Sequence, residues 1–353
     1  MNNKKTKIIL AIDTSCDETS VAVVQGRQVL SHVEYSQIAM HIKWGGVVPS
    51  IARRAHEERI DWVIQKALNK AKLDLKKIDC IAVTYGPGLA IALEVGIRKA
   101  KELAESIKKP IIPVNHMEGH LYSPFVQNSK GNPKIDFNFP YIGLLVSGGH
   151  TELVLFKDHL TYEILGETRD DAAGEALDKA ARMLGFGYPG GPILERLASE
   201  VDNEDKYHFP QPMIGSKNFE FSFSGLKTAF LYKIQEMTDA DKNKDLQNLA
   251  SSFQEAVFQT LMKKTKKAMI QTGINRVLLG GGVAVNNRLK TTMRTMVAIQ
   301  GGSVLFPPFK YLNFDNAAMI GVVASIRAEH GFFATDDDTI DREPRLSLLQ
   351  SSI

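Results

Sequence analysis

The chain has 353 residues, of which 44% are hydrophobic, so it can bury a large core and favours two domains over one. Lysine and arginine outnumber aspartate and glutamate by only 43 to 40, so a nucleic-acid partner would have to meet a local basic patch. After the basic start MNNKKTK, the apolar run IILAI is too short for a signal peptide or a membrane span, which predicts a cytoplasmic protein that uses no membrane. The two cysteines, Cys16 and Cys80, lack the number and spacing of a disulfide framework or a zinc site.

Two stretches about half a chain apart predict β-hairpins. In the first, apolar residues 8–11 and 21–24 flank the polar turn IDTSCDETS. In the second, YIGLLV and LVLF flank SGGHTE between residues 141 and 156. This self-similarity indicates a duplicated α/β domain whose two hairpin tips face one ligand.

The segments between and after the hairpins alternate between helix and strand patterns, as expected for an α/β fold. The stretch 207–230 breaks this rhythm, because it is rich in aromatic residues, proline, glycine and serine, and it predicts a long loop that borders a site. The other predicted elements are helices at 56–71, 98–107 and 246–272, a strand at 78–88, a strand, turn and helix start at 276–290, and a last helix that begins near 315.

Residues 115–120 read NHMEGH and suggest a metal site. His116 and His120 follow Asn115, a candidate helix cap, so both imidazoles project from one helical face. This geometry suits a shared metal ion, although an isolated HxxxH pattern is more often a surface helix with uninvolved histidines. Glu118 lies midway between the histidines, so the HExxH pattern of metalloproteases is absent.

Asp315, in NFDNAAMI, is the best candidate for a third ligand. It lies at a predicted strand-to-helix junction, where its carboxylate can instead serve only as a helix cap. Two imidazoles and one carboxylate with open positions would suit iron or zinc acting as a Lewis acid.

Three glycine-rich turns, at 85–90, 146–151 and 279–286, offer backbone N–H groups that can approach a phosphate or a flat base. None matches the Walker loop or GxGxxG. Three such turns in one chain nevertheless favour nucleotide binding.

Acidic and basic clusters admit two interpretations each. Asp171, Glu175 and Asp178 share a predicted helical face, which is either a solvated surface or a set of acceptors for sugar hydroxyls. Asp17 and Glu18 in the first hairpin tip are either turn formers or functional carboxylates. A further hypothesis is that a basic cluster meets RNA phosphates or merely solvates a helix start; its members are Lys43, Arg53 and Arg54.

Taken together, these motifs resemble one family. The chain is similar to the bacterial TsaD family, also known as Gcp or O-sialoglycoprotein endopeptidase, over residues 7–328. The resemblance implies an actin-like ATPase fold of the sugar kinase and heat-shock type, with two duplicated lobes around a nucleotide cleft. We expect these lobes at 1–135 and 136–333, with a loop inserted near 207–230 and a poorly ordered polar tail at 334–353. The motifs stand in the family's order: DTSCDETSVAVV, GGVVPSIARRAH, NHMEGHL, LLVSGGHTEL, DDAAGEALDKAARMLGFGYPGGP, FSFSGLKTA, LGGGVAVN and DNAAMI.

The resemblance also implies a reaction. A threonylcarbamoyl group would pass from threonylcarbamoyl-adenylate to N6 of adenosine 37 in the anticodon loop of tRNAs that read codons beginning with A. The implied partners are a paralogue without the metal site, similar to TsaB, and a small ATPase, similar to TsaE. Alternatives are a metallopeptidase, an ATP-dependent kinase or hydrolase of the same fold, and a non-catalytic binding lobe.

Family positions map onto this chain residue by residue. His116, His120 and Asp315 match the metal ligands, with Fe²⁺ expected first and Zn²⁺ second, and Asp17 matches an acidic residue needed for activity. Asp17 is therefore our candidate for positioning or deprotonating the amine. The nucleotide-binding positions are Leu145, Val146, Ser147, Gly148, Gly149, Asp178, Gly191, Glu195 and Asn286.

Three positions depart from the family's pattern. Glu195 stands where many members have aspartate, which conserves the charge. Ile91 and Glu94 stand where the family more often has a small residue and an apolar one. These two residues put the shape of the adjacent cleft wall in question.

Overall fold

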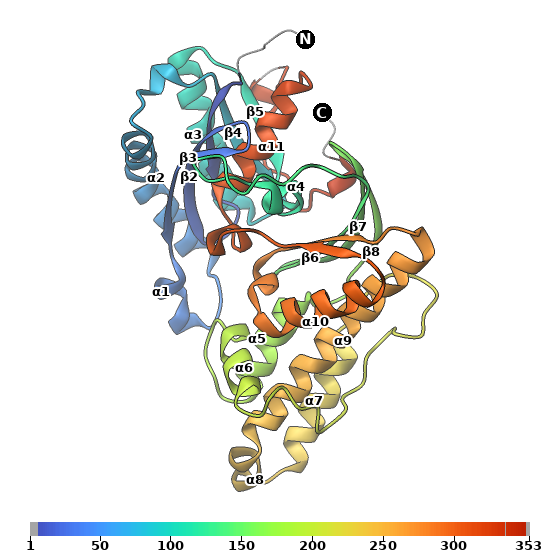
Figure 1. Cartoon of the computed structure of the whole chain (residues 1–353). Helices are drawn as coiled ribbons and strands as arrows, with labels where there is room; N and C mark the ends of the chain where they lie inside the picture. The colour runs from blue at the N-terminus through green and yellow to red at the C-terminus, as the bar shows by residue number, and fades with distance from the viewer. Residues whose placement is uncertain (1–5, 336, 351–353) are drawn as a thin grey trace. The chain divides into compact units, whose positions relative to one another are not determined.

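The computed structural model describes residues 6–335 and 337–350 and divides the chain into two compact units (Figure 1). The first unit comprises Met1–Phe137 and Pro307–Ile353, and the second comprises Asn138–Phe306. Each unit is built around its own five-stranded sheet, so the predicted α/β class is confirmed. No helix within the described ranges is long and apolar enough to cross a bilayer.

The predicted division at 1–135 and 136–333 is wrong at its C-terminal boundary. The chain returns to the first unit after Phe306, and its last long helix, α11 (Ala317–Glu329), packs on the sheet of that unit. The contact is so close that a methyl group on Gly321 would lie 2.6 Å from Val24 Cγ2.

The sheet of the first unit has the order β3-β2-β1-β4-β5. β1 pairs antiparallel with β2 and parallel with β4, β2 pairs antiparallel with β3, and β4 pairs parallel with β5. The parallel strands β1, β4 and β5 therefore end at the same edge. The bounds are β1 Ile8–Asp13, β2 Glu18–Gln25, β3 Gln28–Ser36, β4 Cys80–Gly86 and β5 Ile111–Asn115.

The sheet of the second unit repeats this connectivity as β8-β7-β6-β9-β10. β6 pairs antiparallel with β7 and parallel with β9, and β7–β8 and β9–β10 extend the sheet on either side in the same senses as in the first unit. The predicted hairpins and the predicted duplication are thus confirmed. The bounds are β6 Tyr141–Val146, β7 Thr151–Asp158, β8 Thr161–Glu167, β9 Arg276–Gly280 and β10 Ser303–Leu305.

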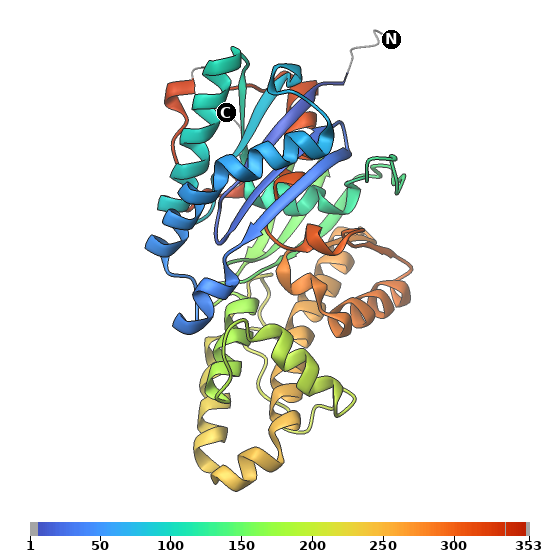
Figure 2. The same ribbon diagram turned by 90° about the vertical axis from the view of Figure 1, so that its left-hand side faces the viewer.

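Helices cover both faces of the first sheet. Leu10, Ile12 and Val23 share a buried cluster with α2 and α3, whereas the alternate residues Ala11 and Val24 face α11. Figure 2 shows α2 lying over the strands. The helices of this unit are α1 Ile38–His41, α2 Pro49–Ala71, α3 Ala90–Ile107, α4 His116–Tyr122 and α11.

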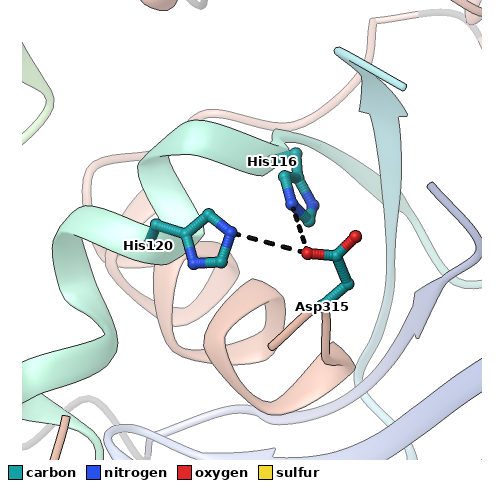
Figure 3. Close-up of side chains that lie close together, drawn as sticks. All are labelled: His116, His120 and Asp315. Atoms are coloured by element: carbon teal, nitrogen blue, oxygen red, sulfur yellow. Dashed lines mark hydrogen bonds and ion pairs between the residues drawn. The ribbon is translucent and has the colours of Figure 1, made fainter. Parts of the chain in front are cut away.

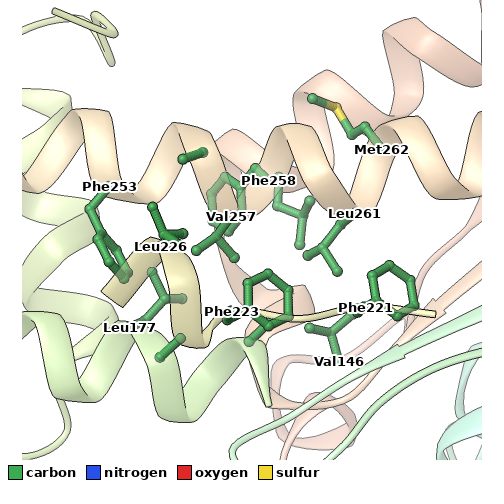
Figure 4. Packing of buried hydrophobic residues seen from close by; sticks show 14 of the residues in the cluster. Val146, Leu177, Phe221, Phe223, Leu226, Phe253, Val257, Phe258, Leu261 and Met262 are labelled. Carbon is green, nitrogen blue, oxygen red and sulfur yellow. The ribbon is translucent and has the colours of Figure 1, made fainter. Parts of the chain in front are cut away.

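The second unit has a helical core around α9. Val257 and Leu261 of this helix are fully buried and pack with Phe221 and Phe223 from the segment that precedes α7, and with Val146 of β6 (Figure 4). The helices are α5 Ala173–Met183, α6 Gly191–Ser199, α7 Ser224–Glu236, α8 Asp239–Lys244, α9 Leu246–Thr272 and α10 Asn287–Ile299.

The prediction of a loop throughout 207–230 is wrong in its second half, where α7 begins at Ser224. The Asp170 carboxylate starts this helix, because its Oδ1 accepts hydrogen bonds from the backbone N–H groups of Phe223 (2.7 Å) and Ser224 (3.2 Å). Phe221 and Phe223 are core residues, so the aromatic content of this stretch serves packing.

The polar tail at 334–353 was expected to be poorly ordered, and its described part instead packs on the first unit. Leu346 and Leu348 are buried, and the Glu343 N–H donates to the Tyr85 carbonyl at 2.7 Å. Arg342 Nη1 lies 2.8 Å from Glu94 Oε2, which gives the unusual Glu94 an ion-pair partner.

A buried ion pair joins α4 to α11. Arg327 Nη2 donates to Glu118 Oε2 at 2.8 Å, and the Arg327 Nε–H donates to the same oxygen at 3.2 Å. Both side chains are almost fully buried. Close helix contact accompanies the pair, since a methyl group on Gly119 would lie 2.8 Å from Met319 Cγ.

Breaking this pair should destabilise the fold strongly. We expect Arg327→Met to lower the free energy of unfolding by about 3 to 5 kcal/mol, because the Glu118 carboxylate stays buried and loses the guanidinium. Urea denaturation measures the change. The control is Arg54→Met, which removes an exposed pair with Glu58 and should cost less than about 1 kcal/mol. Equal losses in the two variants would contradict the prediction.

Two glutamates face each other across strands of the second sheet. Glu152 of β7 pairs in register with Glu167 of β8. Glu152 is buried, and its Oε2 has no hydrogen-bond partner among the described residues. Burial, with a smaller effect of Glu167, raises the pKa of Glu152 to about 7.

This raised pKa predicts a pH-dependent stability. Glu152 holds its proton more tightly in the folded state, so its contribution is most favourable below about pH 4.5 and is lost as the pH rises to about 7. At 1.4 kcal/mol per pKa unit, the loss is on the order of 3 kcal/mol. Glu152→Gln should remove it, so the variant should gain stability over wild type at pH 8 and show little gain at pH 4.5. Thermal unfolding at the two pH values tests this, and an equal difference at both would refute it.

Candidate functional site

Three predicted ligands meet at the C-terminal edge of the first sheet (Figure 3). β5 ends at Asn115, whose side-chain oxygen accepts from the Met117 N–H at 2.8 Å and starts α4. This cap places His116 and His120 on one face, with their rings 4.8 Å apart. Asp315 approaches from the chain that precedes α11, and its Oδ1 lies 3.1 Å from His116 Nε2.

Asp315 is not the helix cap. Asn316 caps α11, since its side-chain oxygen accepts from the Met319 N–H at 3.0 Å. Asp315 follows a short 3₁₀ helix, Lys310–Asn313, where a strand was expected. Its carboxylate is therefore available to the histidines.

The three side chains fit a divalent metal ion. One ligand atom from each lies within 4.8 Å of the others, and both histidines are buried. His120 Nε2 is 3.6 Å from Asp315 Oδ1, beyond hydrogen-bond distance, and within the described ranges neither ring nitrogen of His120 has a hydrogen-bond partner. Buried nitrogens in this state indicate an additional ligand, and two imidazoles with a carboxylate suit Fe²⁺ or Zn²⁺.

Asp13 lies beside His116 and was missed in the sequence. Its Oδ2 lies 3.6 Å from His116 Nδ1, the ring nitrogen that faces away from Asp315. Metal-binding histidines commonly present their second nitrogen to a carboxylate, which fixes the ring. The sequence held a signal for Asp13, because this residue ends β1 at the sheet edge where β5 also ends, just before His116.

The ligand charges are strongly coupled. Burial alone would lower the pKa of His116, but the carboxylates of Asp315 and Asp13 raise it to about 10. Burial would raise the pKa of Asp315, but the two histidines hold it well below its usual range. The site thus stabilises positive charge, supplied by a proton or by a metal ion.

The tip of the first hairpin adds further carboxylates. Asp17 is buried, and its Oδ2 has no hydrogen-bond partner among the described residues. Burial, Asp17 and Asp315 together raise the pKa of Glu18 well above its usual value. His56 of α2 holds this tip, with its Nε2 3.0 Å from the Cys16 carbonyl. Glu18, the neighbour of Asp17, therefore lies within electrostatic range of Asp315.

The SGG turn of the second unit lies at the start of α5. The Gly174 N–H donates to the Ser147 carbonyl at 3.2 Å, and a side chain at 174 would clash with that oxygen. Gly148 and Gly149 are exposed, and a methyl group on either would meet no atom within 4 Å. Packing within the chain gives no reason for these two glycines, so the turn has the features of an anion-binding loop at a helix N-terminus.

The other two glycine turns have internal explanations. A methyl group on Gly86 would lie 2.0 Å from the Glu343 carbonyl, and one on Gly88 would lie 2.5 Å from the Ser15 carbonyl. Gly281 has φ +94°, and a methyl group there would lie 2.4 Å from Val146 O. Close packing accounts for these glycines without a ligand.

Asp178, Glu195 and Asn286 join helices of the second unit to one another. Asp178 Oδ1 accepts from the N–H groups of Gly190 (2.7 Å) and Gly191 (3.2 Å). Glu195 Oε1 accepts from the Asn287 N–H at 2.8 Å. Asn286 caps α10 through the Leu289 N–H (3.1 Å) and donates to Gln254 of α9 (3.0 Å). These predicted nucleotide-binding residues thus have structural roles.

The other residues predicted to bind a ligand in this unit are two residues of β6 and the acidic stripe. Leu145 and Val146 are buried in β6, where both pair with β7, so their side chains serve packing. The predicted acidic stripe is wrong, because Asp171 precedes α5 and contacts Lys179 (2.7 Å) and Lys227 (2.6 Å). Lys179 also neutralises Glu175 at 2.8 Å.

Solved structures share the fold of the whole chain. HypF from T. kodakarensis aligns with a TM-score of 0.61 at 15% sequence identity, covering 94% of this chain and 49% of HypF. A full-length HypF in the phosphate- and nucleotide-bound form aligns with a TM-score of 0.57 at 14% identity, covering 93% of this chain and 56% of that protein. With the duplicated sheets, this likeness confirms the predicted actin-like fold.

Sequence relatives carry one description. The protein named tRNA N6-adenosine threonylcarbamoyltransferase in Thermosipho africanus is 46% identical over 97% of this chain and 100% of its own length. Its namesake in Enterococcus faecalis is 44% identical over 99% of this chain and 98% of its own length. Residues 28–322 match the family TsaD, tRNA N6-adenosine threonylcarbamoyltransferase. On this evidence the chain belongs to the TsaD family of tRNA N6-adenosine threonylcarbamoyltransferases.

Proposed function

We propose that this protein transfers the threonylcarbamoyl group of threonylcarbamoyl-adenylate to N6 of adenosine 37 in tRNAs that read codons beginning with A. Membership of the transferase family supports the reaction class. The observation that carries the proposal is the cluster of two buried histidines and a partly buried aspartate, on which this chemistry can be built. The setting would be the cytoplasm.

His116, His120 and Asp315 would hold one divalent metal, with Fe²⁺ preferred and Zn²⁺ second. When bound, the metal supplies a Lewis acid that orients or polarises the threonylcarbamoyl group. The Asp13 carboxylate, 3.6 Å from His116 Nδ1, would orient the His116 ring electrostatically, and the Glu118–Arg327 pair holds the helix that carries both histidines.

Asp17 is our candidate for positioning or deprotonating the attacking amine. The lone pair of adenine N6 is delocalised into the ring, so the amine is a poor nucleophile and benefits from a nearby acceptor. N6 forms the new bond to the carbamoyl carbon, AMP leaves, and the proton from N6 passes to the acceptor. A buried carboxylate oxygen without a partner among the described residues suits this role.

The second unit would bind the adenylate. The exposed Gly148–Gly149 turn and the first turn of α5 offer N–H groups to the phosphate. Asp178, which directs one oxygen to the Gly190 and Gly191 N–H groups, would offer its second oxygen to ribose hydroxyls. Gly191, Glu195 and Asn286 would shape this surface.

The acceptor base would come from an anticodon loop, where unpaired bases can leave the stack. The proposed partners are a paralogue similar to TsaB, without the metal site, and a small ATPase similar to TsaE. Incubation of unmodified tRNA with the protein, these partners and threonylcarbamoyl-adenylate, followed by mass spectrometry of nucleosides, tests the reaction. Absence of N6-threonylcarbamoyladenosine would overturn it.

Two alternatives are weaker. A metallopeptidase needs a general base beside the metal, and the glutamate nearest in sequence, Glu118, is engaged by Arg327. A kinase or hydrolase rests on the fold alone, and histidine ligands suit a softer metal than the Mg²⁺ of phosphoryl transfer. A peptidase assay with metal-loaded protein distinguishes the metallopeptidase from the transferase.

Ligand removal tests the metal centre. His116→Ala and His120→Ala should each lose most bound metal and most transfer activity while remaining folded, because each removes one of three ligands. His208→Ala, a change at an exposed histidine, is the matched control. Elemental analysis after dialysis measures metal content, and wild-type stoichiometry in either ligand variant would disprove the site.

Asp178 variants test the adenylate surface. Asp178→Ala should weaken binding of AMP about tenfold or more, because it removes the ribose acceptor and loosens the Gly190–Gly191 turn. Asp178→Asn keeps a side-chain oxygen for the Gly190–Gly191 turn, so its affinity for AMP should lie between those of wild type and Asp178→Ala. Metal content should stay at the wild-type value in both. Calorimetric titration with AMP gives the affinities, and unchanged affinity in the alanine variant would argue against this role.

A further inference from the structure

Charge is distributed unevenly in the second unit. From 256 to 306 the sequence has eight basic residues and no aspartate or glutamate. The net charge of +3 for the whole chain hides this local excess. Four of the eight lie close together in the C-terminal half of α9, at Lys263, Lys264, Lys266 and Lys267.

A loop carries a fifth lysine to this helix. Lys264 Nζ donates to Ser216 Oγ (2.7 Å) and to the Asn218 carbonyl (3.1 Å). Lys267 Nζ donates to the Ser216 carbonyl (2.8 Å), so two ammonium groups hold the loop against α9. Lys217 lies on this loop and is exposed. The α9 lysine patch is defined as Lys217, Lys263, Lys264, Lys266 and Lys267.

The positive charge of the α9 lysine patch is not balanced locally. Across the described part of the chain, no carboxylate forms an ion pair with any of its five members. Burial and the neighbouring Lys267 lower the pKa of Lys264, and Glu220 opposes them only partly. The Glu220 carboxylate is itself engaged by Arg169 and by Asn218 Nδ2.

The patch also has a fixed inner layer and an open outer layer. Lys264 is buried and Lys267 is partly buried, and both are held by neutral oxygens. Lys263 and Lys266 are exposed, one turn apart on α9. The inner lysines thus add a permanent field to a surface whose outer lysines can reach an anion.

We propose that the α9 lysine patch binds the phosphate backbone of the RNA substrate. The inference rests on the proposed function, which supplies an RNA as the polyanion. Lysines bind phosphates as point charges and release condensed counterions, so several of them on one helix and its adjoining loop give sequence-independent affinity.

The other candidate basic cluster is less suited to this role. Arg53 and Arg54 of α2 each pair with a glutamate one turn later, at 3.2 Å to Glu57 and 2.9 Å to Glu58. Both arginines therefore have carboxylates beside them that would repel a phosphate backbone, and the third member of this cluster, Lys43, lies over the Trp44 ring. The charge balance favours the α9 lysine patch.

Salt-dependent binding of an unmodified tRNA transcript tests the proposal. The double variant Lys263→Ala, Lys266→Ala should bind more weakly, and the slope of log K against log salt should fall by about 1.4 to 1.8 in magnitude, because two phosphate contacts are lost. The control pair Lys76→Ala, Lys77→Ala removes the same charge from exposed lysines of the first unit and should leave the slope unchanged. Thermal unfolding checks that both variants are folded.

The outcomes are distinct. An unchanged slope in the α9 variant, equal losses in both variants, or wild-type protein that does not bind the transcript would each overturn the proposal. A slope change found instead with Arg53→Ala, Arg54→Ala would place the RNA on α2. Failure of the transfer reaction with a reduced slope in the α9 variant would refute the proposed function and leave the RNA surface standing.

Discussion

The buried ion pair between Glu118 and Arg327 is the interaction on which the cluster of His116, His120 and Asp315 depends. Asp315 comes from a part of the sequence almost 200 residues from the two histidines, so the helices that carry them must be fixed in register. Glu118 lies between the histidines on α4, and Arg327 lies on α11, which begins just after Asp315. A charge pair in a buried position tolerates little displacement, because separation would leave both charges without compensation. The glutamate in NHMEGH thus holds the helix that carries both histidines in register with α11.

The same constraint explains why the chain returns to its first unit. α11 closes the second face of the first sheet and brings Asp315 to the edge where β1 and β5 end. Gly119 and Gly321 allow this approach, since a side chain at either position would clash with the partner element. Metal ligation, helix packing and sheet topology are therefore parts of one arrangement.

Much of this could be predicted from the sequence, and the failures have physical causes. The two hairpins and the helix at 246–272 were predicted because their apolar periodicity is local. The third strands, β3 and β8, were missed, because each is only partly buried and has a weak apolar pattern. The return after Phe306 and the packing of the tail were missed because long-range contacts such as Glu343 with Tyr85 leave no local signal.

Candidate site residues show the same division between local and tertiary information. The spacing of His116 and His120 predicted that both lie on one helical face, and their rings are 4.8 Å apart in the structure. Asp178 and Asn286 also stand out in the sequence, but Asp178 accepts from backbone N–H groups at the start of α6 and Asn286 donates to the Gln254 side chain of α9, which spacing along the chain cannot reveal. Such carboxylates and amides are not excluded from binding a ligand, because each uses only part of its hydrogen-bonding capacity on the fold.

Acidic and basic residues are also distributed unevenly between the two units. In the first unit, Asp13 lies 3.6 Å from His116, and Asp17 and Asp315 both act on the pKa of Glu18, so several carboxylates gather near the cluster of His116, His120 and Asp315. The lysines of α9 lie in the second unit, in a stretch without any acidic residue. The small net charge of the whole chain, +3, therefore conceals two local regions of opposite charge. The acidic region suits a metal ion, and the basic region suits a polyanion.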